Sequence, residues 1–239
     1  MRPTIFLACR VLQELLDGML PAEMPRIYMD ILLHNTPKNL AAALQEKIDA
    51  IESPSNIVVG YGLCGNGLVG VNARAHTLIV PRTHDCVAIF LGSHQRYLQR
   101  FFANPNTYYL TRGWLEAKDE PLTDYNDYVR DYGQEDADYI IDMKYKHYRY
   151  ICMVGFSQAE LDECRPMSQK VAEFCSQRWG MDYEEILGST ELLEDLMRMA
   201  SDPRTDNLEF VVVRDGGEIT AELFHRPGET PPPEPVRRG

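Results

Sequence analysis

Apolar residues follow two alternating patterns along the chain. Three short segments, 4–8, 56–60 and 76–80, have uninterrupted apolar centres at residues 5–8, 57–59 and 78–80, which is typical of strands buried on both faces of a parallel sheet. Residues 37–52 instead carry apolar side chains at helical spacing, and Thr36 is the predicted N-cap of that helix. This alternation predicts an α/β fold with a mainly parallel central sheet flanked by helices, in three layers.

The same patterns continue toward the end of the chain. They predict further strands over residues 26–34, 107–110 and 149–156, and further helices after Thr83, over residues 157–177 and over residues 191–200. Two strand-like segments, 209–214 and 218–224, are joined through Asp215-Gly216-Gly217 and predict a hairpin. We expect one domain over residues 1–226, followed by a disordered, proline-rich tail over residues 227–239.

Residues 115–146 differ from the rest of this domain. The segment is acidic, has no long apolar run and carries tyrosines at helical spacing. It predicts an inserted pair of solvent-facing helices that pack through their tyrosines. The pair is interpreted either as a plain solvated surface or as a surface for a partner protein.

Charge and hydropathy exclude several classes of protein. The 239 residues include 36 acidic and 24 basic ones, which gives a formal net charge of −12. Binding to nucleic acid or to an anionic membrane needs a basic face, so neither partner is expected. No apolar run approaches the ~20 residues of a spanning helix, and charged residues interrupt any signal sequence near the N-terminus. We expect a cytoplasmic protein with reduced cysteines.

Three of the six cysteines occupy equivalent places in the predicted sheet. Cys9 follows the first strand, Cys64 lies in a glycine-rich loop after the third, and Cys86 lies in the first helical turn after the fourth. Because ligands bind at the carboxyl ends of parallel strands, we expect these three sulfurs to converge there. The alternative is that each cysteine is a small core residue, since unpaired cysteine is among the most buried residue types.

His84 and Asp85 precede Cys86 and are the predicted catalytic residues, on a helix capped by Thr83. Three thiolates and an imidazole are ligands of zinc or iron, so His84 is a fourth metal ligand or a general base. Zinc with an open position is the first choice of metal, and an iron–sulfur cluster is the second. The remaining cysteines are assigned to packing: Cys152, Cys164 and Cys175.

Glycines on both sides of Cys64 allow the backbone to approach a ligand closely. Gly62, Gly65 and Asn66 are therefore predicted cofactor-binding residues. Residues 60–65 also fit the GxGxxG fingerprint of dinucleotide-binding proteins, but no acidic residue ends the next strand, so that match is weak.

Two arginines are candidates for binding an anionic substrate group: Arg82, which follows the fourth predicted strand, and Arg112. Arg82 is also a predicted cofactor-binding residue, because a guanidinium binds a carboxylate or phosphate. A surface salt bridge is the alternative interpretation of Arg82.

Four segments together resemble a known family: residues 5–9, 60–67, 80–93 and 107–114. The resemblance is to the prokaryotic domain-of-unknown-function family numbered sixteen thirty-eight, over roughly residues 4–200. It implies that the three cysteines and the His84-Asp85 pair belong to one site. Members are often encoded near corrinoid-dependent methyltransferase systems, which implies a role in methyl-group, one-carbon or thiol metabolism by association.

Two functions compete at this point. The first is a transferase-like, metal-dependent enzyme whose open metal position activates a thiol or binds a small, anionic substrate. The second is an accessory protein without chemistry of its own, which delivers a metal or a corrinoid to a methyltransferase. Turnover of a methyl donor in the absence of other proteins separates the two.

Overall fold

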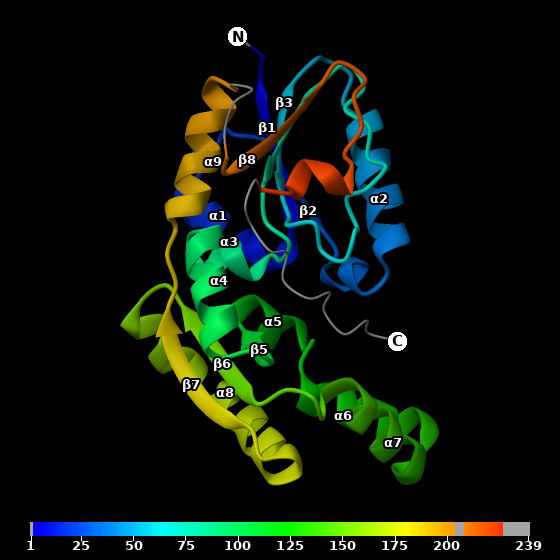
Figure 1. Ribbon diagram of the computed structural model, residues 1–239, viewed down its shortest axis with the longest axis vertical. Helices are drawn as coiled ribbons and strands as arrows, with labels where there is room; N and C mark the ends of the chain where they lie inside the picture. Colours follow the sequence, from blue (N-terminus) through cyan, green and yellow to red (C-terminus); the bar gives the residue numbers. More distant parts are fainter. Residues whose placement is uncertain (1, 204–207, 227–239) are drawn as a thin grey trace. The chain divides into compact units, whose positions relative to one another are not determined.

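The computed structural model describes residues 2–203 and 208–226, and its elements are labelled in Figure 1. The described chain divides into two compact units, residues 2–95 with 190–203 and 208–226, and residues 96–189. The sequence predicted one domain over residues 1–226, within which the structure distinguishes these two units. The proline-rich segment 227–239, expected to be disordered, lies outside the described residues.

The first unit is built on a five-stranded sheet with the order β2-β1-β3-β4-β8. Neighbouring strands from β2 to β4 are parallel, and β8 runs antiparallel to β4. Every residue of β3 and β4 is buried, as the continuous apolar runs predict. The predicted α/β fold with a mainly parallel sheet is confirmed. The five strands are β1 (Thr4–Cys9), β2 (Arg26–Met29), β3 (Asn56–Gly60), β4 (Thr77–Pro81) and β8 (Phe210–Arg214).

Helices cover both faces of this sheet, with α2 and α9 on opposite sides (Figure 1). The helix α2 buries Leu40, Leu44 and Ile48, which recur every four residues along one face. The helices and 3-10 helices of the unit are η1 (Arg10–Leu12), α1 (Gln13–Met19), η2 (Ile31–Asn35), α2 (Pro37–Asp49), α3 (Val87–Leu91), α9 (Glu191–Ser201) and η3 (Ala221–Phe224). The helix α4 (His94–Ala103) begins here and continues in the second unit.

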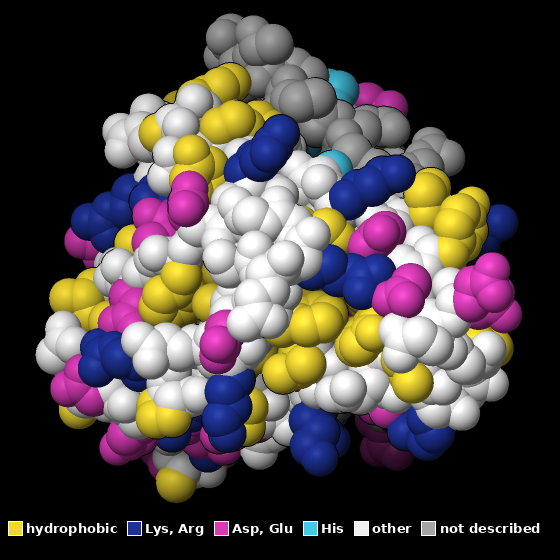
Figure 2. All heavy atoms as spheres, turned by 90° about the horizontal axis from the view of Figure 1, so that it is seen from below, with side chains coloured by type: hydrophobic (Ala, Val, Ile, Leu, Met, Phe, Trp, Pro, Cys, Tyr) yellow, Lys and Arg dark blue, Asp and Glu magenta, His cyan; other side chains and the backbone are white. Residues whose placement is uncertain are grey.

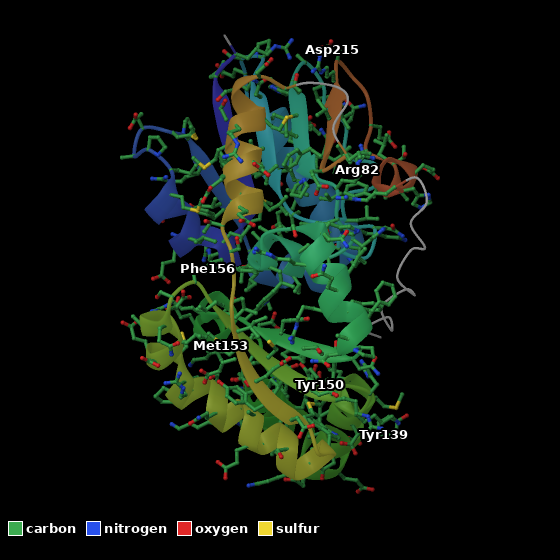
Figure 3. All side chains as sticks on the ribbon, turned by 60° about the vertical axis from the view of Figure 1, so that its left-hand side comes forward. Arg82, Tyr139, Tyr150, Met153, Phe156 and Asp215 are labelled. Atoms are coloured by element: carbon green, nitrogen blue, oxygen red, sulfur yellow. The ribbon has the colours of Figure 1, made fainter. Side chains whose placement is uncertain are left out.

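The second unit contains a separate three-stranded parallel sheet with the order β5-β6-β7. Tyr150 and Met153, labelled in Figure 3, lie on its central strand. One hydrophobic core joins this sheet to α8 and includes Ile151, Val171 and Cys175. The elements are β5 (Thr107–Leu110), α5 (Arg112–Ala117), α6 (Pro121–Tyr132), α7 (Gln134–Tyr145), β6 (Tyr150–Gly155), α8 (Gln158–Trp179) and β7 (Asp182–Leu187).

The tyrosine-rich segment contributes to the core of the second unit. Tyr145 of α7 is buried, and its ring packs edge-to-face on Tyr108 with 5.5 Å between centroids. Its hydroxyl donates to Asp124 of α6 at 2.5 Å. By contrast, Tyr132 and Tyr139 are exposed (Tyr139 is labelled in Figure 3). The predicted packing through tyrosines therefore applies to part of the segment only.

Two predictions about strands are wrong. The predicted hairpin lacks its second strand, because the chain after Gly217 pairs with the loop before β4: the Ile219 N–H donates to the Val71 carbonyl at 2.9 Å. Within the described residues, positions 218–224 contain only an isolated bridge at Glu218 and the 3-10 helix η3. The predicted strand over residues 26–34 ends at Met29, where Asp30 caps the 3-10 helix η2.

Candidate functional site

The loop after β3 and the loop after β4 are held together by backbone hydrogen bonds. The Leu63 N–H donates to the Thr83 carbonyl at 2.8 Å, and the Cys64 N–H donates to the His84 carbonyl at 3.1 Å. Because β3 and β4 are parallel neighbours, their carboxyl ends lie side by side and both loops leave the sheet at the same edge. These two bonds therefore extend the pairing of the strands to the two cysteine-bearing segments.

Cys64 and Cys86 meet at this edge of the sheet. Their sulfur atoms are 2.7 Å apart, and the Gly62 N–H donates to the Cys86 sulfur at 3.3 Å. None of the six cysteines, all within the described residues, forms a disulfide. Disulfide-bonded sulfurs lie about 2.05 Å apart, so the two thiols are in contact without being bonded. The predicted convergence thus holds for two of the three cysteines.

The shape of the glycine loop explains how the two sulfurs approach. A Cβ on Gly62 would lie 2.8 Å from the Asp85 carbonyl carbon and 3.0 Å from the Cys86 nitrogen, so a side chain there would push the two segments apart. Cys64, Gly65 and Asn66 all adopt left-handed backbone angles, with φ of 46°, 62° and 70°. Such angles are strained for cysteine, and strained residues persist where the surrounding structure holds them.

The Cys86 thiol resists ionisation. The pKa of Cys86 is raised well above the ordinary thiol value, first by its hydrogen bond with Cys64, then by burial and by the negative charges of Cys64 and Asp85. The Gly62 N–H acts in the opposite direction, because it stabilises the thiolate. The pair therefore holds a proton that a bound cation would displace.

The Tyr61 hydroxyl is a buried group that sequence reasoning missed. Tyr61 is 1% exposed, and its hydroxyl has no hydrogen-bond partner of good geometry among the described residues. Burial first, and then the charges of Cys9, Cys86 and Cys64, raise the pKa of this hydroxyl, with a weaker contribution from a hydrogen bond with the Cys9 thiol. Sulfur is a weak hydrogen-bond partner, so this interaction does not satisfy the hydroxyl. The signal that could have identified it in the sequence is a large aromatic residue between two glycines of the glycine-rich loop.

Cys9 ends β1 and is 5% exposed. Its charge acts on the same Tyr61 hydroxyl as the charges of Cys64 and Cys86, so the three predicted cysteines share one neighbour. In the part of the chain that the structure describes, no group of three or more His, Cys, Asp or Glu side chains is arranged to hold a metal ion. The role of Cys9 as a third metal ligand stays a prediction.

His84 and Asp85 lie before a helix rather than within one. A helix follows Thr83 as predicted, but its predicted start and cap are wrong: α3 begins at Val87, and the Thr83 hydroxyl donates to the Asp85 carbonyl at 3.2 Å. The first helical amide, that of Val87, instead donates to the Asp85 carboxylate at 2.8 Å. The His84 ring lies 6.1 Å from the His94 ring, centroid to centroid. The His84 carbonyl accepts from the Cys64 N–H, so it pairs with the loop after β3 rather than with an amide of α3.

The two predicted anion-binding arginines make contacts within the protein. The Arg82 guanidinium donates to the carbonyls of Leu223 and, at 3.1 Å, of Phe210, so it ties β8 to η3 (Figure 3). Burial and the nearby Arg226 lower its pKa. Arg112 lies in the second unit, where it pairs with Glu163. The described contacts of Arg82 therefore join structural elements of the first unit.

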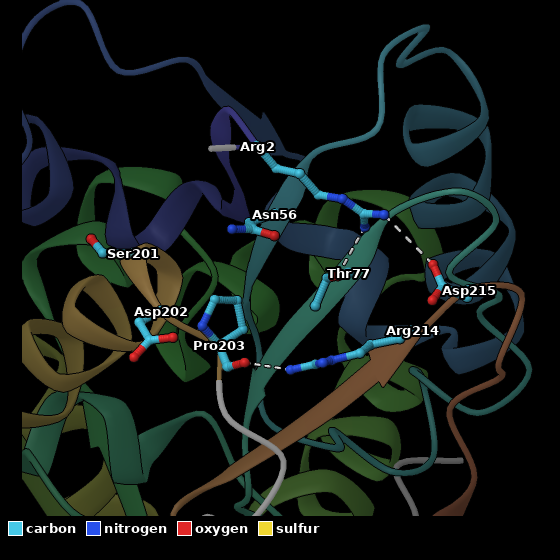
Figure 4. A pocket seen from close by; sticks show the side chains of 8 residues that line it. All are labelled: Arg2, Asn56, Thr77, Ser201, Asp202, Pro203, Arg214 and Asp215. Carbon is cyan, nitrogen blue, oxygen red and sulfur yellow. Dashed lines mark hydrogen bonds and ion pairs between the residues drawn. The ribbon is translucent and has the colours of Figure 1, made fainter.

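A cavity of about 310 Å³ lies at the opposite ends of the same strands (Figure 4). Asn56 and Thr77, which begin β3 and β4, line it. Arg2 donates to the Thr77 hydroxyl at 3.1 Å and pairs with Asp215 at 3.6 Å. None of the predicted site residues lines this cavity, and its charges are balanced. The lining residues are Arg2, Asn56, Thr77, Ser201, Asp202, Pro203, Arg214 and Asp215.

The surface in Figure 2 shows Lys and Arg side chains interspersed with Asp and Glu side chains. Among the described helices, none has both the length and the apolar character needed to cross a membrane.

The fold and the thiol pair define an α/β protein with a dithiol site at the carboxyl edge of a parallel sheet. The chain belongs to the family described as protein of unknown function (DUF1638), whose model matches residues 28–197, more than two thirds of the chain. Tyr61, Cys64 and Cys86 lie within the matched stretch, and Cys9 lies before it. No curated protein and no solved structure matches the chain.

Proposed function

We propose that this protein is a metal-dependent enzyme that binds a soft metal ion through the thiolates of Cys64 and Cys86. The observation that carries this proposal is the 2.7 Å contact between the two sulfurs, together with the Gly62 N–H directed at one of them. Amide donors of this kind stabilise thiolates, which are the metal-binding form of cysteine.

The donor set fits zinc first and an iron–sulfur cluster second. Zinc lies about 2.3 Å from each thiolate and holds two of them roughly 4 Å apart, so the sulfurs must separate slightly when it binds. Cys9 is the proposed third ligand, and His84 is the proposed fourth ligand or general base. Since two protein ligands do not complete a zinc site, this proposal depends on Cys9 or His84 turning toward the pair.

A bound zinc ion would supply a Lewis acid that favours the thiolate form of a thiol substrate. The residues of the chain have separate tasks around it. The Gly62 N–H holds the Cys86 sulfur, and the Tyr61 hydroxyl is the proposed hydrogen-bond donor to a sulfur or to the substrate. His84 and Asp85 are the proposed groups for moving a proton at the edge of the site. Gly65 and Asn66 would line the approach to Cys64, since both are exposed.

The proposed chemistry belongs to methyl-group, one-carbon or thiol metabolism, with a small thiol or anion as substrate. A cytoplasmic location accompanies it, because a thiolate site requires reduced cysteines. The second candidate is an accessory protein that delivers a metal or corrinoid to a methyltransferase or corrinoid protein. The exposed Tyr132 and Tyr139 on α6 and α7 favour a partner surface there, since aromatic residues are enriched at interfaces.

The test is metal analysis and an absorption spectrum after anaerobic purification. We expect bound metal in the unchanged protein and in the control Cys164→Ser, and loss of most of it in Cys64→Ser and Cys86→Ser. Cys9→Ser should lose part of it. Equal metal content in all five proteins, or none in any, contradicts the proposal. Turnover of a methyl donor by the metal-loaded protein alone distinguishes the enzyme from the accessory protein.

A further inference from the structure

The two sulfurs at the carboxyl edge are already close to bonding distance. The gap between the observed 2.7 Å and a disulfide bond of about 2.05 Å is roughly 0.7 Å. The segments that carry them are fixed to each other by the amides of Leu63 and Cys64. A bond between these sulfurs therefore requires that they approach by roughly 0.7 Å, on two segments that are already held side by side.

The two thiols differ in the residues that follow them. Cys64 is partly exposed and is followed by the exposed residues Gly65 and Asn66. Cys86 is also partly exposed, but the five residues of α3 that follow it are all buried. This difference assigns the first attack to Cys64 and the second to Cys86, whose sulfur accepts from the Gly62 N–H.

From this arrangement we propose that Cys64 and Cys86 carry out thiol–disulfide exchange with small-molecule disulfides, a redox activity separate from metal binding. The Cys64 thiolate attacks one sulfur of the small disulfide, and the other sulfur leaves as a thiol. The Cys86 thiolate then attacks the Cys64 sulfur and releases the second small thiol. The protein gives up two electrons and two protons, the small disulfide becomes two thiols, and the protein holds a Cys64–Cys86 disulfide.

This activity goes beyond the proposed function and does not depend on it. A disulfide and a metal ion would use the same two sulfurs, so each would exclude the other. Oxidation to the disulfide would therefore prevent the site from binding a metal ion, and reduction would restore metal binding.

The experiment uses the full-length, reduced protein treated with a chelator and then with oxidised glutathione. We expect an intact mass about 2 Da lower, corresponding to two lost hydrogens, with release of two equivalents of glutathione. Peptide mapping should join the peptides that contain Cys64 and Cys86, and dithiothreitol should reverse the change. The control Cys164→Ser should behave in the same way.

Two variants test the order of attack. Cys86→Ser should retain one glutathione on Cys64, because the resolving thiol is absent, and Cys64→Ser should react at least ten times more slowly. Persistent glutathione on the unchanged protein, a disulfide that includes Cys9, or no reaction overturns the proposal. Because the chelator removes metal beforehand, these outcomes are independent of whether the protein binds a metal. The measurement on the unchanged protein decides the matter even if a variant fails to fold.

Discussion

The thiol pair of the first unit and the buried cysteines of the second unit are the same residue type in opposite settings. Cys64 and Cys86 lie on loops at strand ends, partly exposed, with a backbone N–H directed at one sulfur. Cys152 and Cys175 are 0% exposed, and their burial raises the pKa of each thiol to about 12. The comparison teaches that position relative to the sheet edge, rather than the presence of cysteine, decides which thiols a molecule from solvent can reach.

Cys152 shows that polar neighbours alone do not make a reactive thiol. It lies between Tyr109 and Glu184 in the register across β5, β6 and β7, and an Arg100 nitrogen lies 3.8 Å from its sulfur. Arg100 pairs with Glu184, however, so its charge is already used. Burial and the Glu184 charge raise the pKa of Cys152 by more than Arg100 lowers it.

The largest expected difference between the cysteines of the thiol pair and the buried cysteines is in the rate of alkylation. A thiol with a pKa of about 12 is ionised only to roughly one part in ten thousand at pH 8, and only the thiolate reacts. We expect iodoacetamide to modify Cys152 and Cys175 at least about a thousandfold more slowly in the native protein than in the unfolded chain, and to modify the partly exposed Cys64 well before either of them. Mass spectrometry of digested samples, taken over time, measures the rates.

Unfolding in urea before alkylation is the control for this comparison. All six cysteines should then react at similar rates, since the differences arise from the fold. Rapid native labelling of Cys175 would contradict the contrast between the two regions.

The next effect concerns the glycine that allows the pair to form. Gly62→Ala places a Cβ 2.8 Å from the backbone at Asp85, so the loops after β3 and β4 must separate. We expect a loss of about 2 kcal/mol in the free energy of unfolding, together with loss of the Cys64–Cys86 disulfide after oxidation. Urea unfolding followed by circular dichroism, with peptide mapping, measures both.

Gly18→Ala is the matched control, because a Cβ there meets nothing within 4 Å and Gly18 lies in the helix α1. It should leave the pair intact and stabilise the protein by up to about 1 kcal/mol through helix propensity. An equal disulfide yield in Gly62→Ala and the unchanged protein would show that the pair does not depend on this close approach.

The sequence predicts the meeting of Cys64 and Cys86, because the apolar centres of β3 and β4 indicate buried strands of a parallel sheet, whose carboxyl ends were expected to converge. Tyr61 was missed because its burial and its lack of a good hydrogen-bond partner depend on how the loop folds over it.

Strand β7 was not predicted, because polar residues such as Asp182, Glu184 and Glu185 interrupt the alternation of apolar and polar positions that is typical of a strand. Glu184 and Glu185 form ion pairs with Arg100 and Arg165, which no local pattern reveals. The predicted second strand of the hairpin failed for a related reason, since the turn at Asp215 and Gly216 forms but the chain then pairs elsewhere.

A smaller effect is the dependence of stability on alkaline pH. The folded protein keeps Cys152 and Cys175 protonated up to a pKa of about 12, whereas the unfolded chain releases those protons near pH 8.5. The unfolded state thus binds fewer protons above pH 8.5, so stability falls as pH rises, by about 1 kcal/mol per pH unit for each thiol.

Urea unfolding between pH 8 and 10 measures this slope. The fluorescence of Trp114 and Trp179 reports on the second unit, since both tryptophans of the chain lie there. Cys175→Ala should reduce the slope at the same time as it lowers stability. A slope that does not change in this variant would show that the thiol is not the titrating group.

The smallest expected effect is the change in the free energy of unfolding when one tyrosine hydroxyl is removed from each unit. A buried hydroxyl without a good partner destabilises the fold, so Tyr61→Phe should raise the free energy of unfolding by about 1 kcal/mol in metal-free protein. Tyr145→Phe removes a hydroxyl that donates to Asp124 and should lower it by about 1 kcal/mol or more. Hydrogen exchange of the β3 and β6 amides measures the two units separately. A loss of stability in Tyr61→Phe would mean that the hydroxyl already has a partner within the protein. If the sign is as expected and the same variant also weakens metal binding, the bound ligand supplies the good hydrogen-bond partner that the hydroxyl lacks in the metal-free protein.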